Sequence, residues 1–140
     1  MKTAHAEAER LIAEAPSVEW LREVADALDR ALRRNPLERL TTLWGISNAE
    51  AARMFGVSRQ AFSKWFENGI PAERAAAVAD LDAATNILNR KLKRERIPAV
   101  VRRAAPSLRG KSLYEIACEG RHREVREAVT AMFDLRRIQP

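Results

Sequence analysis

Helical periodicity runs through almost the whole of this 140-residue chain, and it limits the fold more than any other feature of the sequence. Apolar residues recur three and four positions apart, as they do on one face of an α-helix, whereas strand-like alternation is almost absent. Only 5 glycines interrupt the pattern, and the 6 prolines stand where helices could begin or end. The sequence therefore predicts an all-α protein.

Capping signals divide the N-terminal third into three predicted helices. The first covers residues 3–15 and ends before Pro16. Ser17 can cap the second helix, whose apolar positions repeat on one face: Val18, Leu21, Val24, Leu28 and Leu32. The third begins at Asn35, where an N-cap is followed by Pro36 at the first helical position and by a reciprocal glutamate at Glu38.

Further helices are expected after the middle of the chain. A long one extends from Pro71 to about Arg94, a short one covers residues 98–101, and another runs from Ser112 to Gly120. The last helix is expected to bury Val125, Ala128, Val129 and Met132. A boundary at residues 94–98 divides this chain into three predicted parts: a helical extension (1–35), a helix-turn-helix domain (36–95) and a C-terminal interaction domain (96–140).

The most informative stretch is residues 47–68, which has the features of a helix-turn-helix. Ser47 and Glu50 form a capping box that would begin the first helix. Gly56 stands where the turn between the helices needs a positive φ angle, and Ser58 can cap the second helix. The pattern extends over about 20 positions, so it is far more specific than a short motif.

The predicted second helix has an apolar face and a polar face. Its inward stripe is aromatic, with Phe62, Trp65 and Phe66 spaced three and four positions apart. The other face and the helix caps carry the candidate DNA-binding residues: Ser47, Ser58, Arg59, Gln60, Ser63 and Lys64. Glutamine pairs with adenine, and arginine or lysine pairs with guanine, so this face suits base recognition in duplex DNA. A helical corner that never contacts DNA is the alternative.

Positive charge is concentrated near the boundary of the last two predicted parts. Nine basic residues and one acidic residue lie between Arg90 and Lys111, a net charge of +8 in a chain of net charge +6. Such a segment suits a polyanionic partner, although a solvated helix face is the simpler alternative. The candidates for phosphate or partner contacts are Arg94, Arg96, Arg102, Arg103, Arg109 and Lys111.

The order of these features resembles the Xre/MbcA/ParS antitoxins, in which an Xre-type helix-turn-helix precedes a toxin-binding C-terminal domain. Residues 97–121, IPAVVRRAAPSLRGKSLYEIACEGR, look like the start of that second domain, and residues 121–133 like its closing helix. The resemblance covers about residues 40–135. The family usually has a second glycine where Arg109 stands, and often a proline where Leu113 stands.

The resemblance implies a repressor that binds its own promoter as a dimer or larger assembly and neutralises a protein toxin, often of the NAD-consuming RES type. A regulator of phage or chromosomal origin without a toxin is the alternative, and a protein–protein adaptor is a third hypothesis. Leu135 and Ile138 are candidates for a partner contact, unless they belong to the core or to a frayed tail.

Other residues invite a chemical role but fit a structural one better. His5 and His122 have no companion at metal-ligand spacing, and the single cysteine, Cys118, is expected in the core. The three tryptophans are expected to anchor the core: Trp20, Trp44 and Trp65. Since no nucleophile, phosphate-loop or metal motif occurs, neither an enzyme nor a cofactor is expected. The N-terminus lacks a secretory apolar segment, which favours a cytoplasmic location.

Overall fold

Helices make up most of the protein, as the computed structural model shows. It describes residues 17–134, and of residues 30–35 it describes the backbone alone. No strand occurs in this part of the chain, where the one β-type pairing is the isolated bridge between Ala105 and Lys111. The predicted all-α class is therefore confirmed, whereas the predicted helix over residues 3–15 and the candidates Leu135 and Ile138 lie outside the described residues.

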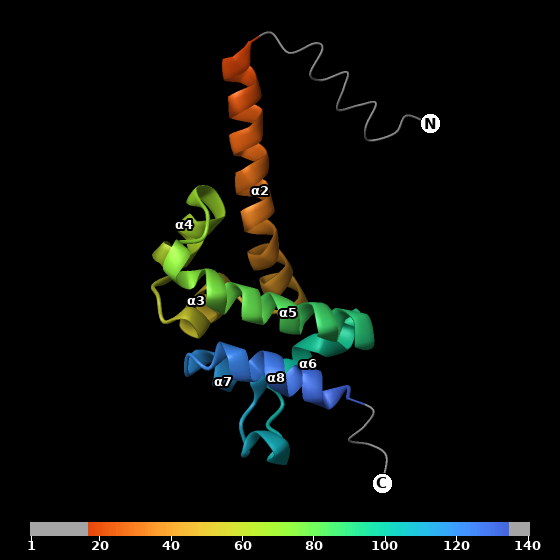
Figure 1. Cartoon of the computed structure of the whole chain (residues 1–140). Helices are drawn as coiled ribbons and strands as arrows, with labels where there is room; N and C mark the ends of the chain where they lie inside the picture. The colour runs from red at the N-terminus through yellow and green to blue at the C-terminus, as the bar shows by residue number, and fades with distance from the viewer. Residues whose placement is uncertain (1–16, 135–140) are drawn as a thin grey trace, which may run out of the picture.

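The helices follow in the order in which Figure 1 labels them. The α-helices are α2 (Val18–Trp44), α3 (Asn48–Phe55), α4 (Arg59–Asn68), α5 (Ala75–Lys91), α6 (Ile97–Arg102), α7 (Leu113–Cys118) and α8 (His122–Met132). Three 3-10 helices precede α5, α6 and α7 in turn: η1 (Ala72–Arg74), η2 (Arg94–Arg96) and η3 (Pro106–Leu108). Within residues 17–134, no helix is both long and apolar enough to cross a membrane.

The helices pack around the lower end of α2, while its N-terminal part projects from the body (Figure 1). Helix α5 runs across this lower end and packs most extensively against α8. Helices α3 and α4 lie on one side of the body, and the C-terminal end of α5 lies on the other. This arrangement separates α4 from the basic segment that follows α5.

One hydrophobic core joins the parts predicted as separate domains. Trp44, Phe62 and Leu81 come from residues 36–95, Val101 and Val125 come from residues 96–134, and all five are fully buried members of one cluster. The cluster includes a polar pair, since the Trp44 indole donates to the Thr85 hydroxyl over 3.0 Å. The boundary near residue 95 therefore lies within a shared core.

The break predicted at residue 35 is wrong, because α2 continues from Val18 to Trp44 with Pro36 inside it. A proline within a helix removes one backbone hydrogen bond and crowds the preceding turn. Directly after Pro36, Leu37 and Leu40 are at most 1 % exposed, so tertiary packing holds the helix at this point. The capping pattern at Asn35 is typical of a helix start, but the burial of Leu37 and Leu40 keeps α2 continuous through this point.

The face expected to be buried on the first half of α2 is also not in the core. Val18 is 71 % exposed and Leu28 is 60 % exposed, and Trp20 is only half-buried. Trp44 and Trp65 are buried as expected. The cause is the projection of α2, which carries residues 18–29 away from the other described helices (Figure 1).

Candidate nucleic-acid interface

Helices α3 and α4 begin at the two serines that the sequence indicated. The Ser47 hydroxyl accepts from the Glu50 amide, and the Glu50 carboxylate accepts from the Ser47 amide, both over 3.1 Å. At α4, the Ser58 hydroxyl accepts from the Ala61 amide over 3.0 Å. Both predicted caps are present, so each helix has a defined first residue.

A short turn at residues 56–58 joins α3 to α4. Gly56 has a φ angle of 65° and donates its amide to carbonyls at the end of α3. A Cβ atom at this glycine would meet nothing within 4 Å, so the constraint is backbone conformation rather than space. Val57 packs against the core beside this turn. The turn therefore fixes the direction in which α4 leaves α3.

An aromatic cluster supports the inner side of α4. Phe62 is fully buried and Trp65 is 6 % exposed. Their ring centres lie 5.5 Å apart, and each lies within 6.0 Å of the Phe55 ring on α3. Two members of the predicted inward stripe, Phe62 and Trp65, are thus buried between the two helices, whereas the third, Phe66, is only half-buried. Because rings at these separations are closely packed, a rotation of α4 about its axis would break their contacts.

Three side chains from distant parts of the chain hold the backbone of α3. Tyr114 on α7 donates its hydroxyl to the Glu50 carbonyl over 2.9 Å, and His122 on α8 donates Nε2–H to the Met54 carbonyl over 2.6 Å. Arg74 in η1 donates to the Phe55 carbonyl over 2.7 Å. The Met54 and Phe55 carbonyls lie at the C-terminus of α3, where carbonyls have no donor within the helix. Sequence reasoning gave these three residues no such role, since their partners are 19 to 68 positions away.

An ion pair fastens α6 to the start of α3. The Arg102 guanidinium donates to the Glu50 carboxylate over 2.8 Å and lies 5.9 Å from the centre of the Tyr114 ring. The Ser47 amide first, and then Arg102, lower the pKa of Glu50 from its ordinary value. Burial raises the pKa of Tyr114 to about 12, so the phenol keeps the proton that it donates. Arg102 is thereby engaged within the protein.

The outward side of α4 carries the polar residues that the sequence selected. Arg59, Gln60 and Lys64 are exposed, and Ser63 is half-buried. Ser47 and Ser58, at the helix starts, are also exposed. The amides of the first turn of a helix have no acceptor within the helix, so the start of α4 presents N–H groups beside these side chains. One end of α4 thus combines positive charge with several hydrogen-bond donors.

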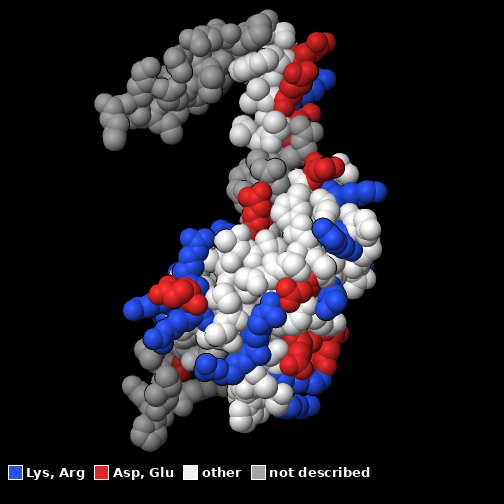
Figure 2. Space-filling view, turned by 180° about the vertical axis from the view of Figure 1, so that it is seen from behind, with Lys and Arg blue, Asp and Glu red and all other residues white. Residues whose placement is uncertain are grey.

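The basic segment does not form one surface with α4. Arg94 and Arg96 are exposed in η2, beyond the end of α5 that lies away from α4 (Figure 1). Lys111 forms an ion pair with Glu119. Figure 2 shows basic side chains in several groups, separated by uncharged and acidic residues, on the face it presents. The run of positive charge in the sequence therefore does not form one continuous surface with α4.

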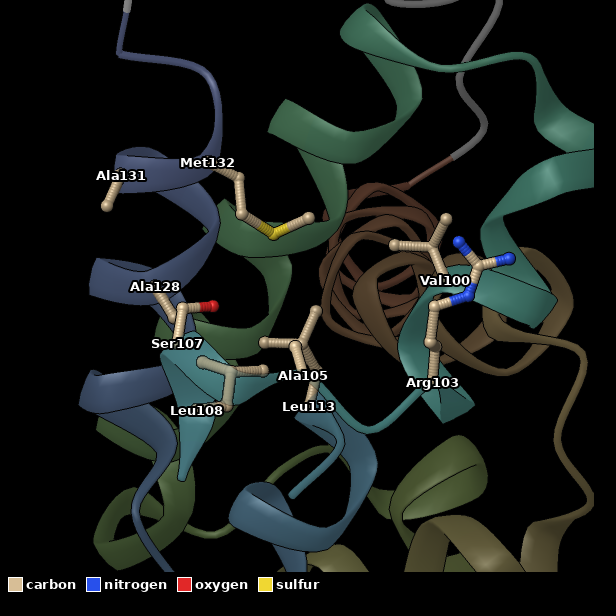
Figure 3. Close-up of a pocket in the computed structure, with 9 residues that line it drawn as sticks. All are labelled: Val100, Arg103, Ala105, Ser107, Leu108, Leu113, Ala128, Ala131 and Met132. Atoms are coloured by element: carbon tan, nitrogen blue, oxygen red, sulfur yellow. The ribbon is translucent and has the colours of Figure 1, made fainter. Parts of the chain in front are cut away.

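An apolar pocket of about 300 Å³ lies between α6, η3 and α8 (Figure 3). Its wall is mostly aliphatic, and it is lined by Val100, Arg103, Ala105, Ser107, Leu108, Leu113, Ala128, Ala131 and Met132. Met132 is 44 % exposed, so the prediction that the last helix buries it is wrong, and Arg103 brings a charged group to the pocket. The candidate residue Arg103 therefore belongs to this pocket and not to the surface of α4.

The loop beside this pocket contains a residue in an unusual conformation. Arg109 has a φ angle of 58°, and no other non-glycine residue between 17 and 134 has a positive φ angle. This left-handed region favours glycine over residues with a Cβ atom. Arg109 is itself exposed.

Cys118 is exposed, so the prediction that it fills the core is wrong. The inward positions of α7 are Leu113, Ile116 and Ala117, each at most 5 % exposed. Cys118 follows them by one position and is therefore turned out of the core by about 100°.

No protein-family model, curated protein or solved structure matches this chain. Two local features of the molecule bear on its function: the exposed face of α4, and the pocket between α6, η3 and α8.

Proposed function

We propose that α3 and α4 form a helix-turn-helix that binds duplex DNA in a sequence-specific manner and acts in transcriptional repression. One observation carries the proposal: Arg59, Gln60 and Lys64 are exposed on α4 while Phe62 and Trp65 hold its other side against the core. A helix supported in this way has the rigidity and the free polar face that entry into a major groove requires.

Each residue of that face has a distinct proposed role. Gln60 can form two hydrogen bonds to an adenine edge, and Arg59 or Lys64 can donate to guanine O6 and N7. The Ser58 hydroxyl, which accepts from Ala61, still has a proton to donate to a phosphate. Ser47 at the start of α3 has the same capacity. Phosphate contacts would fix the position of the protein, and the α4 side chains would select the sequence.

The basic segment, residues 90–111, has fewer side chains available for DNA contact than its net charge of +8 suggested. Arg102 pairs with Glu50 and Lys111 pairs with Glu119, so both have partners within the protein. Arg94 and Arg96 lie beyond the far end of α5. We therefore assign Arg102 to positioning α3, and leave DNA contact to the residues of α4 and its cap.

We further propose that the segment from α6 to α8 binds a protein toxin, which would make the protein an antitoxin that also regulates its own operon. The pocket of about 300 Å³ favours this function, because an apolar hollow with an exposed methionine suits an apolar side chain of a partner. The conformation of Arg109 agrees with the glycine that is usual there in the Xre/MbcA/ParS antitoxins. The resemblance suggests a RES-type toxin.

Replacing Gln60 with alanine is expected to relax selection at one base pair of each half-site. The loss of a two-hydrogen-bond contact costs about 1–3 kcal/mol, or roughly a 5- to 150-fold fall in affinity for the preferred base. Selection of binding sequences from a randomised duplex pool, with wild-type protein and with the Gln60→Ala variant, measures this change. Affinity for random duplex should stay nearly unchanged.

Salt dependence separates DNA binding from the adaptor hypothesis. Phosphate contacts make the logarithm of the affinity fall linearly with the logarithm of salt concentration. A wild-type protein that binds no duplex at low salt, or whose Gln60→Ala variant selects an unchanged sequence, would contradict the assignment of α4. The first result would favour an adaptor.

Replacing Met132 with glutamate is expected to prevent retention of the toxin by the pocket. The test is co-expression with the protein encoded beside this one, followed by purification and by growth measurement with the toxin induced. Arg123→Ala is a matched control, because it also lowers the net charge by one and its side chain is 77 % exposed on α8. Equal retention by the two variants would exclude the pocket, and the lack of any toxin would favour a regulator without one.

A further inference from the structure

We infer that the apolar face of the projecting part of α2 binds the same face of a second copy of this chain. The face comprises residues 18–29, before the helix reaches the body. This inference does not depend on DNA binding, because it rests on the exposure and the pattern of α2 alone.

The projecting part of α2 is divided lengthwise into an apolar half and a charged half. Val18, Leu21 and Leu28 are 71 %, 37 % and 60 % exposed. The remaining apolar positions, Trp20, Val24, Ala25 and Ala27, fall on the same half of a helical wheel. All charged side chains between residues 18 and 29 fall on the other half: Glu19, Arg22, Glu23, Asp26 and Asp29. Figure 2 shows this division as a white side and a red and blue side.

The apolar half has the spacing of a helix–helix seam. Val18, Leu21, Ala25 and Leu28 are separated by three, four and three residues, which is the a/d repeat of a two-stranded coiled coil. In proteins most of the stability of a helix comes from packing of its amphipathic face. Large aliphatic side chains at these exposures therefore point to a missing partner surface.

Among the partners that could cover this face, a second copy fits best. A two-fold dimer needs a self-complementary surface, and an apolar stripe flanked by charges can meet its own copy. Residues 2–16 contain only two large aliphatic residues, the adjacent Leu11 and Ile12, whereas the stripe has three at helical spacing, so that segment is a poorer match than a second copy. A membrane surface is disfavoured because the polar half has four acidic residues and one basic residue, whereas membrane-bound helices are rich in lysine and arginine there.

Sedimentation velocity over a range of protein concentrations tests the inference. The variant Leu21→Lys/Leu28→Lys places two charges in the seam of each copy and is expected to raise the dimer dissociation constant by at least about 100-fold. The control Glu19→Gln/Glu23→Gln changes the charged half of the same helix. Both variants raise the net charge by two, so a general charge effect would appear in both.

The outcomes are distinct. A wild-type dimer, a Leu21→Lys/Leu28→Lys monomer and a dimeric control would support pairing through α2. A wild-type monomer at every concentration would overturn it. A dimer that survives Leu21→Lys/Leu28→Lys would also overturn it, because pairing would then use another surface. Both positions lie outside the core, and circular dichroism together with the thermal transition of the body shows that the variants remain folded.

Discussion

Replacing Phe62 with alanine is expected to lower the free energy of unfolding by about 3–5 kcal/mol. Phe62 is fully buried, and its ring lies 5.5 Å from Trp65 and 5.4 Å from Phe66. Alanine would remove most of this contact and leave a cavity that the surrounding rings can fill only in part. Since a domain of this size is stable by about 5–15 kcal/mol, this single change would remove a large share of its stability.

Urea denaturation followed by tryptophan fluorescence measures this loss. Phe66→Ala is the matched control on the same helix, because Phe66 is only partly buried at the edge of the cluster. It should lower the free energy of unfolding less than Phe62→Ala does. A loss below about 1 kcal/mol for Phe62→Ala would show that the ring is not packed as described.

Reversing two charges on α4 is expected to abolish specific DNA binding. In the variant Arg59→Glu/Lys64→Glu, two donors of the proposed base-contacting face become acceptors that repel the phosphates. Each lost base contact costs about 1–3 kcal/mol, so the combined fall in affinity should be at least about 30-fold. Electrophoretic mobility shift or fluorescence anisotropy with the selected duplex measures it.

The control for this experiment makes the same change of charge elsewhere. Arg94→Glu/Arg96→Glu also lowers the net charge by four, but η2 lies beyond the end of α5 that is away from α4 (Figure 1). Its specific affinity should fall much less than that of the α4 variant. Equal losses in the two variants would mean that net charge, and not the α4 face, accounts for binding.

The sequence predicted best those features that depend on neighbouring residues. The caps at Ser47 and Ser58 join atoms three positions apart, and Gly56 acts through its own φ angle. The exposed face of α4 followed from the same local periodicity, because Phe62 and Trp65 determine which side is buried. Local chemistry was therefore sufficient for this part of the chain.

Features that depend on distant residues were not predictable in this way. Pro36 lies within α2 because Leu37 and Leu40 are buried beyond it, which a local capping pattern cannot reveal. Arg102 of the basic segment pairs with Glu50, 52 positions away, and no local pattern reveals this partner. Nor does the amphipathic pattern of residues 18–29 specify whether its partner lies in the same chain.

The hydrogen bonds to the backbone of α3 limit how this chain can evolve. Tyr114 and His122 donate hydrogen bonds to backbone carbonyls of α3, and Arg102 donates one to the Glu50 carboxylate in its first turn. A C-terminal segment recruited from another protein would have to supply equivalent donors at matching positions, or leave the Met54 carbonyl at the C-terminus of α3 without its donor. Substitutions in α6 to α8 that change the choice of partner must therefore leave these donors in place. Substitutions that remove a donor require compensating changes in α3.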